Sequence, residues 1–423
     1  MGFVKELERR GMVHDIMPGT EEELAKGVAS GYIGFDPTSD SLHIGNLVQV
    51  MTLVHFQRAG HKPIALVGGA TGMVGDPSGK SQERNLLDVE TLRRNQEGIR
   101  KELSKFLDFD CGENSALLVN NFDWFGPMGF LDFIREAGKH ISINYMLAKD
   151  SVKSRMETGM SFTEFSYQLV QGYDFYHLNK EYGCKLQLGG SDQWGNIVTG
   201  TELIRRMGSG EAFAVTTPLI KKADGTKFGK TESGAVWLNK EKTSVRDFYQ
   251  YWLNASDQDA VTYLKIFSLK NMEEIEALVS LHEKDPGKKM IQKELGKEIT
   301  VRVHSKEEYD ALGLDRNIMF DRSIGKEELA SMGREEFEKS VGSFDKVEVN
   351  WNPDLGLLPF LSGETGIYAS NGEARRALQG NAVAINKEKI KEDFQIQEED
   401  WLYGFYMIVS KGKKKHVIVK RGE

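Results

Sequence analysis

The chain has 423 residues, a formal net charge of −8 and 39% hydrophobic residues. Such a length corresponds to about two or three domains, and the charge does not indicate nucleic-acid binding over the whole surface, although it can hide a local basic patch. Cys111 and Cys184 are its two cysteines, and their isolation argues against a disulfide framework and a zinc site. The sequence lacks a bilayer-length apolar run and a signal-peptide pattern, so we expect a cytoplasmic protein.

The clearest sequence feature is a junction between a strand and a helix near residue 40. The strand-like segment 28–35 must end at Asp36 and Pro37, because proline cannot donate to a β-ladder and restricts the residue before it. A helix then opens at residues 42–46, Leu-His-Ile-Gly-Asn. The free N–H groups and the positive dipole end of such a helix attract phosphate, so the junction predicts a nucleotide site.

The same strand–turn–helix pattern recurs further along the chain. Apolar residues 64–67 run into the glycine-rich segment 68–72, and residues 185–188 run into segment 189–193, which a helical pattern over 194–207 follows. This alternation predicts an α/β fold with a parallel sheet. Ligands of such sheets bind outside the carboxyl ends of the strands, so we expect one crevice there. The residues expected to face it are Asp36, His43, Thr71, Asp76, Asp192 and Gln193.

Two common nucleotide-binding motifs do not fit this chain. Segment 75–81 nearly matches a P-loop, but its glycines are one residue too close together, and residues 82–85 are a poor start for a buried helix. The dinucleotide fingerprint also fails, because Gly69, Gly72 and Gly75 repeat every three residues. A glycine-rich turn accounts for these residues. Asp76 stays a candidate because it follows the end of a strand.

A helical segment over residues 162–178 carries a polar stripe. Tyr167, Gln171 and Asp174 fall at i, i+4 and i+7, which puts a phenol, an amide and a carboxylate on one face. Apolar residues fill much of the remaining surface, so the stripe is expected to lie in or beside protein. A solvated face is the usual meaning of such a stripe. Buried polar groups do need partners, however, and a small ligand would supply them.

A lysine-rich segment spans residues 221–231. Its glycines favour a flexible loop, and Lys227 and Lys230 are compact charges suited to phosphate. A basic, solvated turn is the alternative.

Changes in sequence texture predict three domains. Residues 1–220 form the α/β domain, and residues 221–345 contain the lysine-rich segment, a small helical domain and a polar linker. Helical spacing between residues 245 and 283 defines the helical domain. Residues 352–423 form the third unit.

These motifs together resemble the bacterial tyrosyl-tRNA synthetases, a family of class I aminoacyl-tRNA synthetases. Segment 32–46 is similar to the HIGH signature of that class, and Lys-Phe-Gly-Lys-Thr at 227–231 is similar to its KMSKS loop. Further segments that match in the same order are 68–72, 161–167, 189–196 and 223–227. The resemblance covers essentially the whole chain. It implies a Rossmann-like parallel-sheet catalytic domain, a small helical domain and a C-terminal α+β S4-like RNA-binding domain.

The resemblance implies that the chain activates L-tyrosine with ATP and Mg²⁺, releases pyrophosphate, and transfers tyrosine from tyrosyl-adenylate to the 3′ end of tRNA(Tyr). It implies no tightly bound, protein-ligated metal. The residues implied in catalysis are Thr38, His43, Asn46, Lys227, Lys230 and Thr231. Those implied in tyrosine binding are Tyr32, Asp76, Tyr167, Gln171, Asp174 and Gln193. Those implied in ATP binding are Asp36, His43, Gly45, Asn46, Asp192 and Lys230.

The C-terminal part is similar to the S4 RNA-binding module over residues 370–386, and a basic cluster follows at 411–421. Cations in such a module bind RNA phosphates in a salt-dependent way. A helix followed by a charged hairpin is the alternative interpretation. The implied RNA contacts are Arg375, Arg376, Lys411, Lys413, Lys414 and Lys415. The resemblance also implies a homodimer.

Two positions depart from the family pattern. Asn46 stands where the signature usually ends in His, and Ile33 stands where relatives often have Cys. Asn can still donate through its amide, whereas Ile33 has no hydrogen-bonding group in its side chain. One alternative is therefore an RNA-binding relative that kept the fold and lost aminoacylation. A synthetase for tryptophan is a nearer alternative, which Tyr32 and Asp174 disfavour.

Overall fold

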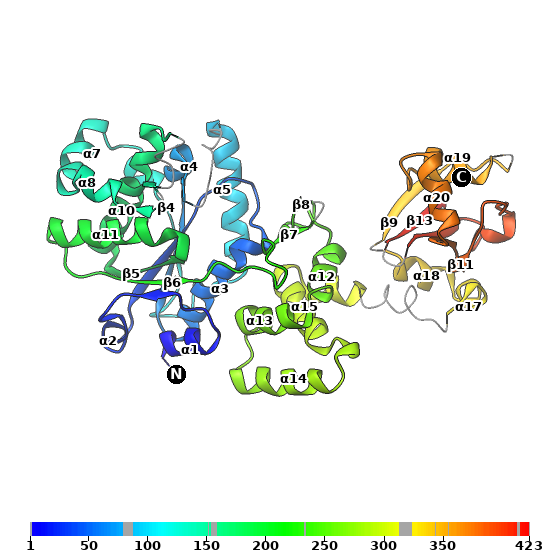
Figure 1. Ribbon diagram of the computed structural model, residues 1–423, viewed down its shortest axis with the longest axis horizontal. Helices are drawn as coiled ribbons and strands as arrows, with labels where there is room; N and C mark the ends of the chain where they lie inside the picture. The colour runs from blue at the N-terminus through cyan, green and yellow to red at the C-terminus, as the bar shows by residue number, and fades with distance from the viewer. Residues whose placement is uncertain are drawn as a thin grey trace. The chain divides into compact units, whose positions relative to one another are not determined.

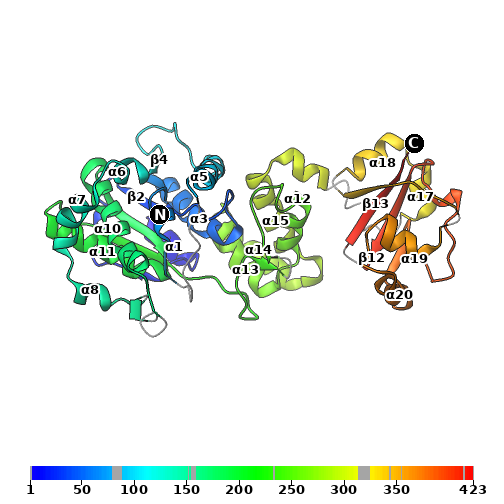
Figure 2. The same ribbon diagram turned by 90° about the horizontal axis from the view of Figure 1, so that it is seen from above.

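A computed structural model describes residues 2–78, 88–150, 152–153, 159–231, 234–312, 324–342, 344–353, 355–412 and 415–422. The chain divides into two compact units, Met1–His304 and Ser305–Glu423 (Figures 1 and 2). Lys413, Lys414 and part of the rejected P-loop segment lie outside the described residues. Among the described residues, no helix is both long and apolar enough to cross a membrane.

The first unit is built on a six-stranded sheet with the order β1-β6-β5-β2-β3-β4. The strands are β1 (Asp15–Ile16), β2 (Ser30–Phe35), β3 (Lys62–Val67), β4 (Leu117–Asn120), β5 (Cys184–Gly190) and β6 (Phe213–Thr217). All neighbours pair in parallel except β1, which is antiparallel to β6. The predicted parallel α/β sheet is confirmed. The order of the strands changes between β2 and β5: β3 and β4 follow β2 toward one edge of the sheet, and β5 and β6 extend toward the other edge. Ligands bind at this switch point in such folds.

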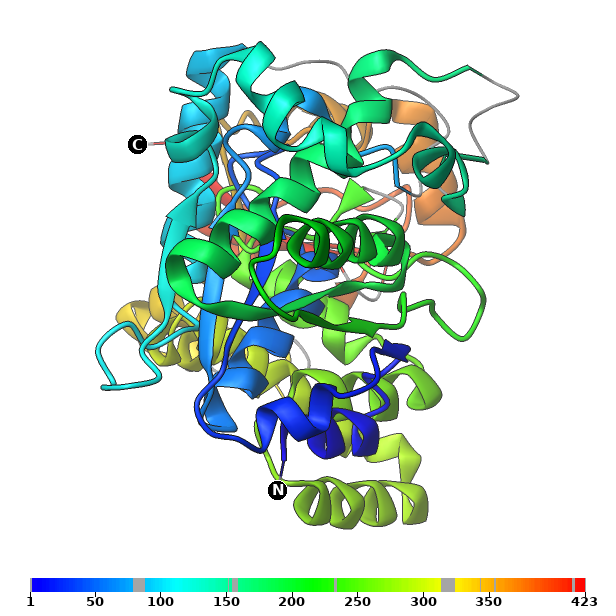
Figure 3. The same cartoon turned by 90° about the vertical axis from the view of Figure 1, so that its left-hand side faces the viewer.

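Helices cover both faces of this sheet. On one face α3 (Ile44–Arg58) packs with α1 (Phe3–Arg9) and α5 (Val89–Leu103), and on the other α10 (Phe162–Tyr182) and α11 (Trp194–Met207) lie side by side (Figure 3). The shorter helices and turns of this region are α2 (Thr20–Leu24), α4 (Thr71–Val74), α6 (Phe122–Phe125), α7 (Phe130–Glu136), η1 (Gly138–His140), α8 (Ile143–Leu147) and η2 (Ser191–Gln193). The predicted helices over 162–178 and 194–207 are both present, the first extending to Tyr182.

Strand alternation assigns the side chains of β2 to different cores. Ile33 and Phe35 join the core that contains α3, whereas Tyr32 joins the core that contains Phe175 of α10. Successive side chains of a strand point to opposite faces, so this register puts Tyr32 on the same side of the sheet as the polar stripe of α10.

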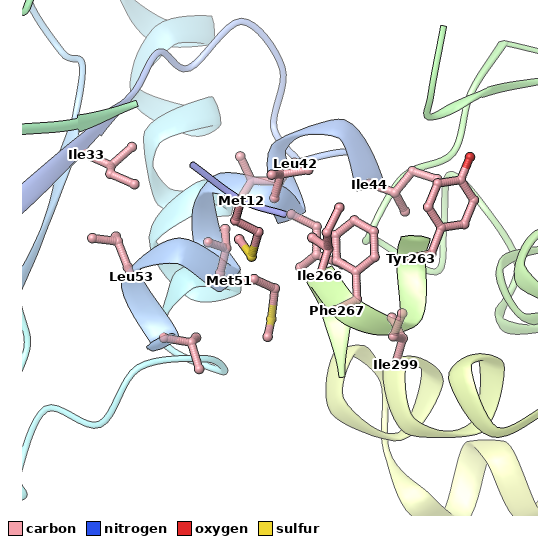
Figure 4. Packing of buried hydrophobic residues seen from close by; sticks show 14 of the residues in the cluster. Met12, Ile33, Leu42, Ile44, Met51, Leu53, Tyr263, Ile266, Phe267 and Ile299 are labelled. Atoms are coloured by element: carbon pink, nitrogen blue, oxygen red, sulfur yellow. The ribbon is translucent and has the colours of Figure 1, made fainter. Parts of the chain in front are cut away.

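A helical segment completes the first unit. It consists of α12 (Val245–Leu253), α13 (Asp257–Phe267), α14 (Met272–Lys284), η3 (Pro286–Lys288) and α15 (Met290–Val303), and it follows a short hairpin of β7 (Lys230–Thr231) and β8 (Gly234–Ala235). Tyr263, Phe267 and Ile299 from these helices pack in one core with Met51 of α3 (Figure 4). Arg10, which is almost fully buried, donates to the backbone oxygens of Lys265, Ser268 and Lys270. The helical segment is therefore packed directly onto the sheet's helical layer.

The second unit has its own five-stranded sheet with the order β11-β10-β12-β13-β9. Its elements are α17 (Lys326–Ser331), α18 (Arg334–Ser340), β9 (Asp345–Val349), α19 (Leu357–Pro359), η4 (Phe360–Glu364), α20 (Asn371–Gln379), β10 (Val383–Ile385), β11 (Glu388–Lys389), η5 (Glu398–Asp400), β12 (Tyr406–Lys411) and β13 (Lys415–Arg421). Leu378, Val383 and Met407 lie in its core. The predicted third unit is thus an α+β structure.

Helix α5 holds the turn between β2 and α3 through side-chain hydrogen bonds. Asn95 donates to the backbone oxygen of Pro37 at 3.0 Å, and Glu102 accepts from the Ser41 hydroxyl at 2.7 Å and the Leu42 N–H at 2.6 Å. A Cβ atom on Gly98 would lie 1.9 Å from the backbone oxygen of Asp40. Only glycine allows α5 and this turn to approach so closely.

Gly98→Ala should therefore destabilise the protein. Overpacking typically costs about 1–3 kcal/mol, and a clash at 1.9 Å with a backbone atom puts Gly98 at the upper end of that range, above the gain of roughly 1 kcal/mol from replacing a helical glycine by alanine. Urea denaturation measures the free energy of unfolding. Gly138→Ala is the matched control, because its Cβ would meet nothing closer than 3.8 Å. Equal stability of the two variants would contradict the close approach of α5.

Candidate active site

A cavity of about 580 Å³ opens at the carboxyl ends of β2, β3 and β5. The predicted residues that line it are Tyr32, Asp36, Thr38, His43, Gly45, Asn46, Thr71, Asp76, Tyr167, Gln171, Asp174, Asp192, Gln193, Lys227 and Lys230. Residues from widely separated parts of the sequence thus meet in one place. The predicted Thr231 lies in β7, and only its backbone is among the described parts of the chain. The sheet-edge argument correctly predicted this crevice.

The closed end of the cavity holds a buried carboxyl group. Asp174 accepts a hydrogen bond from the Asn121 amide at 3.0 Å and another from the Trp124 indole at 3.0 Å. Burial raises the pKa of Asp174 to about 8, although both hydrogen bonds oppose this shift by stabilising the ionised form. The hydroxyl of Tyr32 is buried with no hydrogen-bond partner among the described residues. An unpaired buried hydroxyl is costly, so this end is suited to a ligand with a polar group.

A chain of hydrogen bonds leads from Asp174 to Asp36. The Asn121 amide lies 3.1 Å from the Thr71 hydroxyl, which donates to Asp36 Oδ1 at 2.7 Å. The Tyr167 hydroxyl donates to Asp36 Oδ2 at 2.9 Å. Burial, together with the charge of Asp36, raises the pKa of Tyr167 well above its usual range, which keeps it a donor. These contacts hold Asp36 in a fixed orientation at the end of β2.

Asp76, which lines the cavity, is hydrogen-bonded by amide side chains. Gln193 donates to Asp76 Oδ2 at 2.8 Å, and the Ser78 N–H donates to Oδ1 at 2.9 Å. The amide of Asn196 lies 3.0 Å from Gln171 Oε1 and 3.5 Å from Asp76 Oδ1. This arrangement combines one negative charge with several amide groups, which suits an ammonium group next to a carboxylate.

The start of α3 is shaped by His43, Gly45 and Asn46. The N–H of His43 donates to Asn46 Oδ1 at 3.1 Å, so Asn46 closes the first helical turn. A Cβ on Gly45 would lie 2.8 Å from His43 Cε1, so glycine is needed for the imidazole to hold this position. Asn46, the departure from the family signature, therefore has a structural contact at the helix start. Ile33, the other departure, is buried at the cavity wall.

The lysine-rich loop is anchored by residues that lie between Lys227 and Lys230, the two lysines predicted to bind phosphate. Phe228 is buried against Tyr263 and Phe267, with ring centroids 4.8 and 5.5 Å away. Gly229 has φ +84°, and a Cβ there would lie 3.1 Å from the backbone nitrogen of Gly45. The exposed Lys227 and Lys230 line the cavity on either side of this anchor. The loop thus brings two cations to the helix N-terminus.

The cations predicted to bind RNA lie in the second unit. Arg375 pairs with Glu392 at 2.6 Å, while Arg376 and Lys415 are exposed. Lys411 pairs with Glu373 at 2.6 Å and lies 4.4 Å from the centre of the Tyr368 ring. Lys411 is therefore engaged within its own unit, a contact that the charge pattern of the sequence did not indicate.

Several residues in and around the cavity were missed by the sequence analysis. Gln49, Gln187 and Trp237 line the cavity, whereas Asn121, Trp124 and Asn196 hydrogen-bond residues that line it. Asn121 follows β4 directly, so the rule that applied to β2, β3 and β5 would have found it had this short strand been recognised. Asn196 falls at the start of a predicted helix, one turn after Asp192. Nothing in the sequence pattern alone distinguishes Gln49 or Trp237 from ordinary helix and loop residues.

Comparison with known proteins agrees with this geometry. Residues 25–320 match the family model for tRNA synthetases class I (W and Y), and residues 336–419 match the model for the tyrosine--tRNA ligase SYY-like C-terminal domain. Tyrosine--tRNA ligase of Cytophaga hutchinsonii is 54% identical over 99% of both chains, and that of Flavobacterium johnsoniae is 53% identical with the same coverage.

Solved structures show the same relationship. A C-terminally truncated mitochondrial tyrosyl-tRNA synthetase of Aspergillus nidulans aligns with a TM-score of 0.68 and 30% identity, over 75% of this chain and 94% of that chain. A tryptophanyl-tRNA synthetase from Encephalitozoon cuniculi shares the fold, with a TM-score of 0.52 and 16% identity, over 72% of this chain and 86% of that chain.

The fold, the cavity and the family model together define a class I tRNA synthetase of the tryptophan and tyrosine group. Within that group, the full-length matches show that the chain belongs to the tyrosine--tRNA ligase family. The resemblance stated from the sequence is confirmed. The matches give no support to a relative that has lost aminoacylation.

Proposed function

We propose that the chain activates L-tyrosine with ATP, forming tyrosyl-adenylate and pyrophosphate, and then transfers tyrosine to the 3′ end of tRNA(Tyr). The observation that carries this proposal is the closed end of the cavity, where the carboxyl of Asp174 and the unpaired hydroxyl of Tyr32 are buried together. A phenol satisfies both groups. Phenylalanine leaves the Tyr32 hydroxyl unpaired and gives Asp174 no donor beyond Asn121 and Trp124, which explains in physical terms a discrimination already established for tyrosyl-tRNA synthetases.

The remaining contacts to tyrosine follow from the charges of the cavity. The ammonium group of the amino acid lies near Asp76, Tyr167 and Gln171, and its carbonyl group lies near Gln193. Since Asp76 is a carboxylate that lines the cavity, it supplies the opposite charge. This orientation directs the substrate carboxylate toward the N-terminus of α3, where ATP is expected.

ATP occupies the part of the cavity between the start of α3 and the lysine-rich loop. The adenosine portion contacts the residues Asp36, Gly45, Asn46 and Asp192, and the pyrophosphate portion contacts Thr38, His43, Lys227, Lys230 and Thr231. The tyrosine carboxylate attacks the α-phosphorus while the bond to pyrophosphate breaks, so no protein nucleophile is needed. The protein aligns the reactants and stabilises the charge that develops on the leaving pyrophosphate.

Among the described residues, no group of three or more His, Cys, Asp or Glu side chains is arranged to hold a metal ion. The described side chains do not fit a metal site made by the protein alone. Mg²⁺ therefore belongs to this proposal only as part of the ATP substrate, since this ion usually binds through substrate phosphates.

The second unit is proposed to bind tRNA, with Arg375, Arg376, Lys411 and Lys415 among the phosphate contacts and Lys413 and Lys414 between them in sequence. We retain the division into residues 1–220, 221–345 and 352–423 as a proposal about function: activation, loop support and tRNA binding. We also propose cytoplasmic localisation, where tRNA is charged.

We propose a homodimer as well. Its support is a set of large exposed apolar side chains of the first unit: Phe130 and Leu131 on α7, Ile143 on α8 and Phe162 on α10. Exposed apolar surface of this kind is typical of protein–protein interfaces.

Tyrosine-dependent exchange of pyrophosphate into ATP tests the proposed activation step. Purified protein should catalyse exchange with L-tyrosine and not with L-tryptophan or L-phenylalanine at the same concentration. Exchange with tryptophan alone would indicate the alternative specificity. An absence of exchange in protein that still binds tRNA would favour the non-catalytic alternative.

Tyrosine binding should depend on pH through Asp174. Its pKa of about 8 means that the carboxyl is mainly protonated in the free protein below that pH. A phenol that donates to the carboxylate selects the ionised form, so binding releases a proton. Tyrosine affinity should then rise by about tenfold per unit as pH increases toward 8, and level off above it. Calorimetric titrations from about pH 6 to about pH 9 measure this profile.

Asp174→Asn is the control, because it removes the titrating group and should give a flat profile with weakened binding. An affinity for tyrosine that falls as pH rises toward 8 would contradict donation from the phenol to the carboxylate.

Removing residues 305–423 should abolish tRNA charging and leave tyrosine-dependent exchange largely intact. The unit Met1–His304 has its own cores, and every described residue that lines the cavity belongs to it. Exchange and charging assays on the truncated and full-length chains measure the two steps separately. Loss of both activities would mean that the second unit supports the fold of the first.

A further inference from the structure

A second segment of chain is fastened to the turn that carries His43. The N–H of Ile44 donates to the backbone oxygen of Val236 at 2.9 Å, and the N–H of Leu238 donates to that of Leu42 at 2.9 Å. His43 and Trp237 face each other in this short ladder. The segment around Trp237 follows the lysine-rich loop directly, and the Val236 N–H donates to the Gly229 oxygen at 3.1 Å. The turn around His43, called here the histidine turn, and the lysine-rich loop are thus both hydrogen-bonded to one backbone segment, residues 236–238, which is called the strip.

Lys242 adds a side-chain link at the end of this strip. Its ammonium group donates to the Ser39 hydroxyl at 3.0 Å, forms an ion pair with Asp40, and lies 4.7 Å from the centre of the Trp237 ring. The ion pair with Lys242 holds the pKa of the Asp40 carboxyl below its usual range. A lysine in this position contacts both the turn and the strip.

The Trp237 ring connects Lys242 to the site. Its edge packs against the His43 imidazole with ring centroids 5.8 Å apart, and both rings line the cavity. Lys242 itself does not line the cavity, whereas its partner Ser39 does. Lys242 therefore acts on the cavity through other residues. Its ammonium group is attracted to the face of the indole, which fixes the ring that supports His43.

We propose that Lys242 is a positioning residue for adenylate formation: with Asp40 and Trp237 it holds the histidine turn in register with the lysine-rich loop. This inference rests on the proposed activation of an amino acid by ATP. The reaction needs the pyrophosphate contacts from His43 and from Lys230 at the same moment, and these side chains come from the two segments that Lys242 joins. A small displacement between them lowers the rate of the chemical step without changing the closed end of the cavity.

If Lys242 only stabilised the fold, its removal would lower the melting temperature. The side chains of Lys242 and Asp40 are 32% and 39% exposed, and ion pairs this open to solvent contribute little to stability. Removal of the charge should therefore leave the melting temperature unchanged. The expected signature is a loss of kcat with normal folding and normal tyrosine affinity.

The test compares Lys242→Met, which keeps the length of the side chain, with Lys242→Arg, which keeps its charge. In tyrosine-dependent pyrophosphate exchange, kcat of Lys242→Met should fall by about 10- to 100-fold, and Lys242→Arg should restore most of it. The tyrosine dissociation constant and the melting temperature should stay at their original values. Lys284→Met, an exposed lysine substitution on α14, is the matched control and should leave kcat unchanged.

Asp40→Asn extends the test to the partner. It should lower kcat to a similar extent, and the double variant with Lys242→Met should be no slower than either single variant, because both remove the same link. Additive losses, or an unchanged kcat in Lys242→Met, would overturn the proposal. So would a parallel loss of kcat, tyrosine affinity and thermal stability that Lys242→Arg does not restore.

A crystal structure of Lys242→Met separates this inference from the proposed function. The inference expects the Trp237 ring to leave its position against His43. If the original protein shows no exchange, the proposed function fails, and the crystal structure alone decides the role of Lys242. A Trp237 ring that keeps its packing against His43 in the variant would overturn the inference whatever the activity.

Discussion

The carboxyl group of Asp174 is buried, and the surrounding residues provide the hydrogen bonds that replace its lost solvation. Asn121 and Trp124 donate to its two oxygens, and Asn121 also reaches Thr71, which orients Asp36. Burial of an ionised carboxyl group is unfavourable unless hydrogen bonds compensate for the lost solvation. The raised pKa of Asp174 shows that the two hydrogen bonds compensate only in part. The polar network around the amino-acid pocket is thus organised by the solvation of one group. Under the proposed function, the hydroxyl of the substrate tyrosine adds a further donor to this network.

The other end of the cavity depends on close backbone packing. Gly98 lets α5 approach the turn after β2, Gly45 makes room for the His43 ring, and Gly229 brings the lysine-rich loop onto the start of α3. Phe228 anchors that loop in the aromatic core of the helical segment. Because that core is continuous with the core under α3, the lysines are positioned by the same packing that positions the helix N-terminus. The end of the site at Asp174 therefore depends mainly on side-chain hydrogen bonds, whereas the end at the start of α3 adds close steric packing at glycines to its hydrogen bonds.

The sequence predicted the elements whose signals are local. Pro37 and the apolar run before it located β2, and helical spacing located α10, α11 and α12. Tyr32, Asp174 and Lys230 became site candidates partly through family resemblance, and the sheet-edge rule predicted that such residues would meet. Asn121 and Trp124 were missed because β4 is only four residues long and carries no distinct pattern. Lys242 contacts residues about two hundred positions earlier in the chain. Contacts between such distant residues cannot be predicted from helix or strand periodicity in the sequence.

If the second unit binds RNA as proposed, its paired cations determine how strongly salt concentration influences that binding. Arg375 and Lys411 already have the carboxylates of Glu392 and Glu373 as neighbours, so RNA phosphate must replace an internal anion at each of them. Fewer counterions are then expelled from the nucleic acid per protein cation than a simple count of basic side chains gives. Under the same proposal, the exposed Arg376 and Lys415 carry the larger electrostatic share. RNA affinity would then vary less with salt concentration than a count of basic side chains gives.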